Sequence, residues 1–217
     1  MDLSTARLNM VKTQLETWGV NDDRILDLYT RIPREDFVLD EYKDLAYADM
    51  DLPIGHGEIM LPPKSEARML QALNIRPDES VLEIGTGSGF FTLLLAKLAK
   101  RVHTVDIHDD LVSQAQARLK KQRIQNVKFY TGDASHGWDQ AGQVDVVVIT
   151  GSLPLLPKGF RKCLNPTGRL MAIIGEAPAM TVTLIQPLPE NQWETVSVFD
   201  TVVPPLLHAT EPEKFTF

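Results

Sequence analysis

Three glycines at alternate positions, directly after an apolar run that contains an acid, are the residues of this chain best suited to bind a ligand. Residues 81–84 are Val-Leu-Glu-Ile, Gly85, Gly87 and Gly89 follow, and an apolar, helix-compatible run begins at Phe90. This order predicts a strand, a tight glycine turn and a helix. Such a turn lets the backbone approach a nucleotide-like ligand at a helix N-terminus, so the stretch predicts a binding site of that type.

The spacing of the glycines distinguishes between the known nucleotide turns. A dinucleotide-binding turn has the order Gly-x-Gly-x-x-Gly, whereas here the third glycine comes one residue early and Phe90 occupies the expected place. A P-loop is excluded because no Gly-Lys-Ser/Thr follows. The order Glu-x-Gly-x-Gly-x-Gly, from Glu83 to Gly89, resembles motif I of the S-adenosylmethionine-dependent methyltransferases. It therefore disfavours an NAD-dependent enzyme.

Two acids farther along the chain agree with this interpretation. Asp106 ends the next apolar run, about 20 residues after the turn, where a carboxylate can accept the ribose hydroxyls. Asp133 follows the strand after that and could receive the adenine amino group. Either acid alone could be an ordinary strand-end or turn residue. Together with the turn they lie at the carboxyl ends of successive predicted strands, which favours a site.

The sequence thus predicts S-adenosylmethionine as the cofactor and no metal. Glu83 is open to two interpretations, since it could lie beside the methionine part of the cofactor or serve mainly to pin the turn. The predicted cofactor-binding residues are Glu83, Gly85, Thr86, Gly87, Gly89, Asp106, Ile107, Asp133, Ala134 and Thr150.

The elements that must position these residues follow from hydrophobic periodicity. Leu8, Val11, Leu15 and Trp18 predict one face of a helix over residues 4–18, and a second helix begins after Asn21. An irregular segment, 33–63, precedes a helix at 65–73. After the turn, strands at 102–107, 127–130, 144–149 and 169–174 alternate with helices at 109–119 and 157–164. Two last strands, 181–186 and 194–203, are joined by a turn short enough to imply antiparallel pairing.

These elements predict an α/β fold of the Rossmann-like, class I methyltransferase type. The sheet is expected to be mostly parallel with an antiparallel C-terminal edge, and a helical cap precedes it. We expect a single domain over residues 1–217, with the cap and substrate loop at 1–75 and the cofactor-binding core at 76–217.

Composition limits the partners of the chain. The 29 acidic and 22 basic residues give a net charge of −7, which argues against a general nucleic-acid binder or an anionic-membrane binder. The single cysteine, Cys163, fits a reducing compartment and is expected to be a small buried side chain. No apolar run approaches the roughly 18 residues of a membrane span, and no export signal is visible. We therefore expect a cytoplasmic protein, with its oligomeric state open.

Most of the chain resembles the protein-L-isoaspartate O-methyltransferase family. The resemblance covers residues 10 to 175, and its most specific elements are Pro-Arg-x-x-Phe-Val at 33–38 and Leu-Pro-Ile-Gly-x-Gly at 52–57. It implies methyl transfer to the free carboxylate of isoaspartyl residues in proteins or peptides, the first step of protein repair. A carboxylate is already ionised at neutral pH, so it needs no general base. His56 and His136, the only candidates for a base, are more simply explained as loop residues.

The chain departs from the family in the predicted substrate loop. Family members usually have Gln-Thr-Ile-Ser, whose hydroxyls help hold the acceptor carboxylate, whereas this chain has Glu58, Ile59, Met60 and Leu61. The change removes two hydrogen bonds, each worth about 1.5–3 kcal/mol to a charged group. Glu58, Ile59 and Leu61 are therefore the candidate substrate-contacting residues. Two alternatives stay open: a different, less charged acceptor, or a cofactor-binding protein without isoaspartyl activity.

Overall fold

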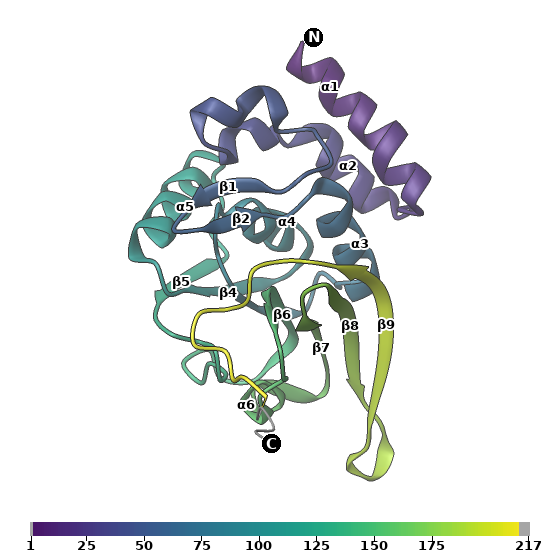
Figure 1. Cartoon of the computed structure of the whole chain (residues 1–217), viewed down its shortest axis with the longest axis vertical. Coiled ribbons are helices and arrows are strands. Elements are labelled where there is room, and N and C mark those ends of the chain that lie inside the picture. The colour runs from purple at the N-terminus through teal and green to yellow at the C-terminus, as the bar shows by residue number, and fades with distance from the viewer. Residues whose placement is uncertain (1, 213–217) are drawn as a thin grey trace, which may run out of the picture.

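The computed structural model describes residues 2–212, which form a central sheet with helices on both faces and a helical cap at one end (Figure 1). The last five residues of the predicted core range lie outside the described part. Across the described residues, no helix combines the length and the apolar character that a bilayer crossing requires.

The central sheet has the strand order β5-β4-β3-β6-β7-β8-β9. Its first five strands are parallel, and β8 and β9 are antiparallel to their neighbours, which confirms the predicted antiparallel edge. The β8–β9 hairpin projects beyond the rest of the sheet (Figure 1). The strands are β3 (Ser80–Ile84), β4 (Arg101–Asp106), β5 (Val127–Thr131), β6 (Val144–Leu153), β7 (Leu164–Glu176), β8 (Ala179–Pro187) and β9 (Trp193–Thr201).

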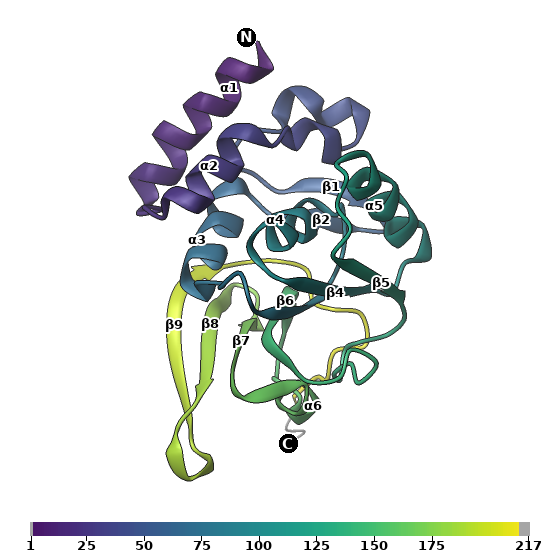
Figure 2. The same ribbon diagram turned by 180° about the vertical axis from the view of Figure 1, so that it is seen from behind.

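Two apolar clusters form on the two faces of this sheet. Alternate residues of a strand point to opposite faces, so Val81 joins one cluster and Leu82 the other. The first cluster contains residues of the cap and of α3 (Pro63–Leu73), α4 (Phe90–Leu98) and α5 (Asp109–Lys121). The second contains Trp138, Phe160 of α6 (Lys158–Lys162) and the buried Cys163. The cap and the sheet thus share one hydrophobic core (Figure 2).

The first predicted helix has the expected extent but a different buried face. α1 (Leu3–Met10) continues through a π-helical turn (Val11–Leu15) and a 3-10 turn (Glu16–Trp18), and α2 (Asp23–Arg31) follows. Leu8 and Trp18 were expected to be on the apolar face, but they are 46% and 54% exposed. The wider π turn changes the angle between successive residues, so a face extrapolated at 3.6 residues per turn does not continue through it.

The segment expected to be irregular, 33–63, contains a small β-hairpin. β1 (Leu52–Gly55) pairs with β2 (Glu58–Met60), and the turn between them holds His56 and Gly57 at positive φ. Two 3-10 turns, Arg34–Phe37 and Asp40–Leu45, precede the hairpin. The chain then enters α3, and residues of the hairpin border the same cavity as the carboxyl ends of β3 and β4.

Candidate active site

The carboxyl ends of β3, β4, β5 and β6 meet the β1–β2 hairpin and the C-terminal segment around one cavity of about 100 Å³. In a parallel sheet this edge is the usual place for a ligand. Ten of the predicted site residues line the cavity; they are Glu58, Ile59, Leu61, Gly85, Gly87, Asp106, Ile107, Asp133, Ala134 and Thr150. Among the described residues that line it, none is Lys or Arg.

Two glycines of the turn are required for different reasons. Gly85 has φ +97°, and a Cβ there would overlap the hydroxyl of Thr150, which donates hydrogen bonds to the carbonyls of Ile84 (3.0 Å) and Gly85 (2.9 Å). Gly89, with φ +84°, precedes α4, and a Cβ there would lie 2.8 Å from that of Ala115. Gly85 therefore keeps the turn close to β6, while Gly89 lets α4 pack on α5.

Glu83 lies beneath the turn and does not line the cavity. Its Oε2 atom accepts hydrogen bonds from the hydroxyls of Thr92 and Thr104, both at 2.6 Å, and Thr104 also contacts the hydroxyl of Thr86 at 2.7 Å. Complete burial raises the pKa of Glu83 to about 8, with a smaller contribution from the charge of Asp106, although the two hydroxyls oppose the shift. This placement favours the second interpretation of Glu83, in which it pins the turn between α4 and β4.

Asp106 connects the glycine turn to the end of β4. Its two carboxylate oxygens accept hydrogen bonds from the backbone N–H groups of Gly87 (2.8 Å) and His108 (3.0 Å). Each oxygen of an ionised carboxylate has a further lone pair, so Asp106 can also accept hydrogen bonds from a ligand in the cavity. The carboxylate is therefore both part of the turn and part of the cavity wall.

Asp133 follows β5 at the far end of the cavity. One oxygen accepts a hydrogen bond from the N–H of Ser135 (2.9 Å), and the other contacts Nδ1 of His208 (2.8 Å). The Ser135 N–H and the His208 side chain hold the pKa of Asp133 below its usual value, against the effect of burial. Asp133 is thus an ionised hydrogen-bond acceptor at neutral pH.

The substrate-loop candidates form the opposite wall of the cavity. Glu58 is half-buried, and its pKa is raised by burial and by the charge of Asp106, while His108 and His56 oppose the shift. Ile59 and Leu61 contribute apolar surface.

A buried ion pair holds this wall from behind. Arg34 donates hydrogen bonds to the carbonyl of Leu61 and to Glu66 of α3, and its guanidinium lies 4.8 Å from the ring centre of Phe90. Tyr29 also donates to Glu66, at 3.3 Å. The Pro-Arg-x-x-Phe-Val element thus fixes the loop from the protein interior.

The sequence did not reveal two parts of the cavity wall. One is His108, whose Nε2 atom is buried and has no hydrogen-bond partner among the described residues. α5 begins at Asp109, so His108 rather than Asp109 occupies its N-cap position. Asp109 instead accepts a hydrogen bond from Thr131 (2.9 Å).

The other part is the segment after β9, which lines the cavity with Val203, Pro204, Leu206 and Leu207. Ser152 holds it, because its N–H donates to the Pro204 carbonyl (3.0 Å) and its carbonyl accepts from the N–H of Leu206 (2.9 Å). No periodic pattern marks this segment, and only the Pro204-Pro205 pair hints at its extended course.

His56 and His136 lie outside the cavity lining. His56 lies in the hairpin turn, and its Nε2 atom contacts both carboxylate oxygens of Asp110 (2.9 and 3.0 Å). His136 contacts the hydroxyls of Ser135 (2.8 Å) and Thr210 (3.2 Å). Both histidines are therefore loop residues whose contacts stabilise the local structure. Within the described residues, no cluster of three or more His, Cys, Asp or Glu side chains is arranged to hold a metal ion.

The chain is similar to known proteins over most of its length. Residues 6–201 match the family model described as protein-L-isoaspartate(D-aspartate) O-methyltransferase. Protein-L-isoaspartate O-methyltransferase 1 of Syntrophobacter fumaroxidans is 33% identical over 195 residues, covering 90% of this chain and 91% of the relative. The protein-L-isoaspartate O-methyltransferase of Photorhabdus laumondii is 38% identical over 174 residues, covering 80% and 83%.

A solved structure agrees with the fold. It is the structure of a Plasmodium falciparum protein described as a protein-L-isoaspartate O-methyltransferase, in complex with S-adenosyl-L-homocysteine. Its TM-score is 0.78 at 20% identity, and the match covers 92% of this chain and 97% of that one. The fold prediction is therefore confirmed, and on the family model and the sequence relatives this chain belongs to the protein-L-isoaspartate(D-aspartate) O-methyltransferase family.

Proposed function

We propose that this chain binds S-adenosylmethionine in the cavity at the carboxyl end of its sheet and transfers the methyl group to the free carboxylate of an isoaspartyl residue in a protein. One observation carries the proposal. The glycine turn, the acids at the ends of β4 and β5, and the loop from Glu58 to Leu61 all border the same cavity. Family membership supports the same reaction.

The residues around the cavity fit this cofactor. Asp106 has free lone pairs for ribose hydroxyls, and Asp133 is an ionised acceptor for the adenine amino group. Gly85 and Gly87 have no side chains that would block the approach of the cofactor to the turn. The buried, unpartnered Nε2 of His108 is a further polar atom available to a ligand. When bound, the cofactor supplies an electrophilic methyl group on a positively charged sulfur.

The chain's own part in the reaction is to position the acceptor and to exclude water. A carboxylate has a pKa of about 4, so it is ionised at neutral pH and attacks without a general base. Ile59 and Leu61 on one side and the segment around Leu206 on the other give apolar walls. Holding the carboxylate in line with the methyl group and the sulfur supplies most of the acceleration.

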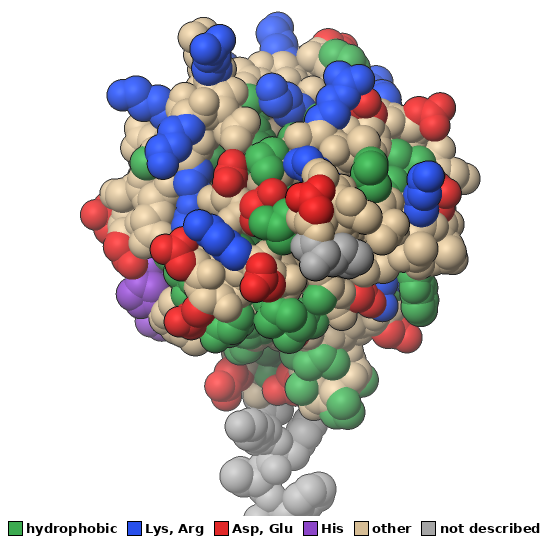
Figure 3. Space-filling view, turned by 90° about the horizontal axis from the view of Figure 1, so that it is seen from above, with side chains coloured by type: hydrophobic (Ala, Val, Ile, Leu, Met, Phe, Trp, Pro, Cys, Tyr) green, Lys and Arg blue, Asp and Glu red, His purple; other side chains and the backbone are tan. Residues whose placement is uncertain are grey.

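The proposed partner is a protein or peptide substrate in the cytoplasm. The net charge of −7 argues against a nucleic-acid partner and against a membrane partner. Basic and acidic side chains both occur across the face shown in Figure 3.

A direct transfer assay tests the proposed function. The chain is incubated with S-adenosylmethionine labelled in the methyl group and with either an isoaspartyl peptide or the aspartyl peptide of the same sequence. We expect label in the isoaspartyl peptide only. Equal label in the two peptides, or none, contradicts the proposal. The Asp106→Asn variant is the matched control for transfer that depends on the cavity.

A less charged acceptor is the second candidate, and the cavity wall supports it. Ile59 and Leu61 have no hydroxyls, and no Lys or Arg lines the cavity within the described residues. In the double variant Ile59→Thr, Leu61→Ser, a gain of isoaspartyl transfer would favour this candidate, and unchanged transfer would count against it. Tight binding of S-adenosylhomocysteine without turnover of either peptide would favour a binding protein instead.

A further inference from the structure

Two of the three carboxylates that border the cavity are Glu58 and Asp106, and no Lys or Arg is among the described residues that line it. Asp106 reaches it from the end of β4, and Glu58 reaches it from the β1–β2 hairpin. The hydrogen bonds of Asp106 come from backbone N–H groups. The side chain of Glu58 has neither a hydrogen bond nor an ion pair within the described residues, and its nearest influences are the charges of Asp106, His108 and His56.

The position of Glu58 is set by its hairpin. Nε2 of His56 contacts both oxygens of Asp110 in the first turn of α5, and its ring stacks on His108 at 3.9 Å between ring centres. These contacts join the hairpin turn to the segment that directly follows Asp106. Glu58 is two residues after His56 in this hairpin, and Asp106 is the charged group with the largest effect on its carboxylate.

Neither histidine forms a side-chain hydrogen bond or ion pair with Glu58 or Asp106 in the described structure. His56 is already paired with Asp110, and no hydrogen bond joins His108 to Glu58 or its side chain to Asp106 in the described structure. A half-buried carboxylate without a partner is costly to ionise beside a second carboxylate, and burial together with Asp106 raises the pKa of Glu58. A ligand that donates hydrogen bonds to both acids would remove this cost.

A vicinal diol is the ligand group whose chemistry fits two such acceptors, because its adjacent hydroxyls can each donate one hydrogen bond. We propose that Glu58 is a second ribose-binding carboxylate, which accepts a hydrogen bond from one ribose hydroxyl of the cofactor while Asp106 accepts one from the other. The inference rests on the proposed function only in that the cofactor carries a ribose.

This assignment changes the meaning of the substitution in the substrate loop. The negative charge of Glu58 faces the cofactor, so it does not repel an acceptor carboxylate placed against Ile59 and Leu61. The loop then has two parts with different roles. Its first residue binds the cofactor, and the residues at 59 and 61 contact the acceptor.

The affinity for S-adenosylhomocysteine, measured by titration calorimetry, tests the assignment without turnover. A hydrogen bond to a charged group is worth about 1.5–3 kcal/mol, so we expect Glu58→Gln to weaken binding by roughly 10-fold or more. Asp51→Asn is the matched control, because it removes an exposed acid directly before the same hairpin that does not line the cavity, and we expect a change below about 2-fold. Thermal unfolding of each variant verifies that it is folded.

The 2′-deoxy and 3′-deoxy forms of S-adenosylhomocysteine provide a second, independent measurement. Against the wild type, each analogue is expected to bind about 10-fold more weakly than the parent compound. Against Glu58→Gln, one of the two analogues should show no further loss, because the hydroxyl that it lacks no longer has a partner.

The outcomes separate this inference from the proposed function. Full penalties for both analogues with Glu58→Gln, or unchanged affinity for S-adenosylhomocysteine together with a lower KM for the isoaspartyl peptide, would overturn the assignment and place Glu58 at the acceptor. A wild-type chain that does not bind S-adenosylhomocysteine would overturn the proposed function itself. Weaker cofactor binding at an unchanged peptide KM supports the assignment.

Discussion

Two acids at the amino ends of the parallel strands and two acids at the carboxyl ends have pKa values shifted in opposite directions. At the amino ends, Glu79 and Asp145 have pKa values held below the usual range. At the carboxyl ends, Glu58 and Glu83 have pKa values above it. Burial acts in the same direction at both ends, since it raises the pKa of every carboxyl group. The difference therefore comes from the partners that the chain supplies.

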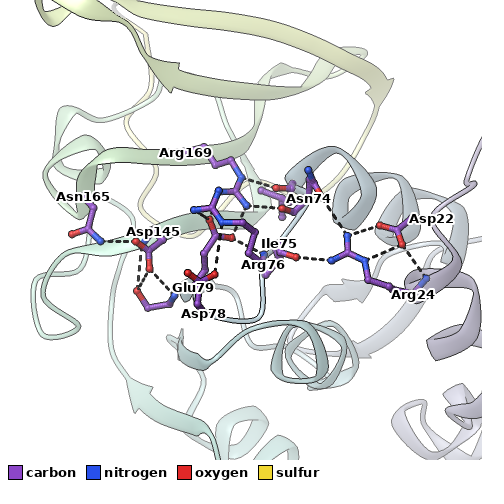
Figure 4. Close-up of polar contacts among 12 residues, drawn as sticks. Asp22, Arg24, Asn74, Ile75, Arg76, Asp78, Glu79, Asp145, Asn165 and Arg169 are labelled. Atoms are coloured by element: carbon purple, nitrogen blue, oxygen red, sulfur yellow. Dashed lines mark hydrogen bonds and ion pairs between the residues drawn. The ribbon is translucent and has the colours of Figure 1, made fainter.

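At the amino ends every acid is supplied with donors (Figure 4). The guanidinium of Arg169 donates to both oxygens of Glu79 at 2.8 Å and also to the carbonyls of Leu73 (2.5 Å) and Asn74 (3.0 Å). Asp145 accepts from the N–H and hydroxyl of Ser80 and from the amide of Asn165, at 2.7 to 2.8 Å. This network joins the end of α3 to β3, β6 and β7.

At the carboxyl ends Glu58 and Glu83 are left with unused acceptor atoms, whereas Asp133 has partners that hold its pKa below the usual value. Oε1 of Glu83 is buried without a partner in the described structure, and the side chain of Glu58 has no hydrogen bond to another described residue. Buried polar groups are normally satisfied, so the unpartnered Oε1 of Glu83 and Nε2 of His108 at this end of the sheet are consistent with a site for a ligand or a proton. The amino ends are therefore suited to stabilise the fold, and the carboxyl ends are suited to bind a ligand.

The largest expected effect is at the rigid end. Arg169→Met removes the bidentate partner of the buried Glu79 carboxylate, which keeps only its contacts with the exposed Arg76, and it leaves two helix-end carbonyls without their donor. We therefore expect a loss of about 3–5 kcal/mol in the free energy of unfolding. Urea denaturation measures this loss. The affinity for S-adenosylhomocysteine should stay within about 2-fold of the wild type, because the cavity is at the other end of the strands.

Arg24→Met is the matched control for this prediction. Arg24 belongs to the same network, where it donates to the carbonyl of Ile75 (3.0 Å), but its side chain is 46% exposed. An exposed ion pair is worth about 0–1 kcal/mol, so the control should lose less than Arg169→Met. Equal losses from the two variants would show that burial does not decide the strength of the network.

The second effect is a pH dependence that originates at Glu83. Its pKa is raised from 4.5 to about 8 in the folded chain. The stability that the neutral, buried form contributes is fully present below pH 4.5 and is lost as the pH rises toward 8. Each pKa unit corresponds to 1.36 kcal/mol, so the free energy of unfolding should fall by about 3 kcal/mol between pH 5 and pH 8 through this group.

Glu83→Gln should flatten that slope, because a glutamine is neutral at every pH and can still accept from Thr92 and Thr104. Urea denaturation at a series of pH values measures it. Glu79→Gln is the control at the other end of the sheet, and it should not flatten the slope, since the pKa of Glu79 is lowered. A wild-type slope that survives in Glu83→Gln would show that Glu83 is ionised when buried.

The third effect is on binding. Asp106→Asn keeps the shape of the side chain but removes the charge that receives the ribose hydroxyls in the proposed site. We expect the affinity for S-adenosylhomocysteine to fall by about 10- to 100-fold, which corresponds to 1.5–3 kcal/mol. The free energy of unfolding should change less than in Arg169→Met. Unchanged affinity in calorimetry would remove Asp106 from the site.

The sequence was informative where the relevant contacts are local or follow from the parallel sheet. The three glycines occupy one short turn, and parallel strands bring Asp106 and Asp133 to the same edge, so the cavity wall that they form could be predicted. The antiparallel edge followed from the short connection between the last two strands. These features depend on order and spacing, which the sequence contains.

The remaining parts depend on tertiary packing. The strands of the β1–β2 hairpin are four and three residues long, and such short strands show no clear alternation. The approach of residues 203–207 to the cavity depends on where the chain returns after β9. The sequence made Glu58 a candidate for contacting the substrate, and only the structure shows that it lines the same cavity as Asp106.

The smallest expected effect concerns the C-terminal segment that closes the cavity. His208 contacts Asp133, but its side chain is 67% exposed and that of Asp133 is 43% exposed, so this pair contributes about 0–1 kcal/mol. The segment is held mainly by Ser152, whose backbone groups bond to Pro204 and Leu206 and whose hydroxyl donates to the carbonyl of Val203 (3.1 Å). His208→Ala should therefore weaken the binding of S-adenosylhomocysteine by less than about 5-fold.

Ser152→Ala removes the buried hydroxyl but keeps the backbone bonds, and it should cost about 1 kcal/mol in the free energy of unfolding. Calorimetry and urea denaturation of His208→Ala and Ser152→Ala compare the exposed contact of His208 with the buried contact of Ser152 on the same segment. A larger loss of affinity in His208→Ala than in Asp106→Asn would mean that the segment, rather than the strand ends, controls binding. In that case ligand binding at the carboxyl end of the sheet would depend on the C-terminal segment as well as on the unpaired acids.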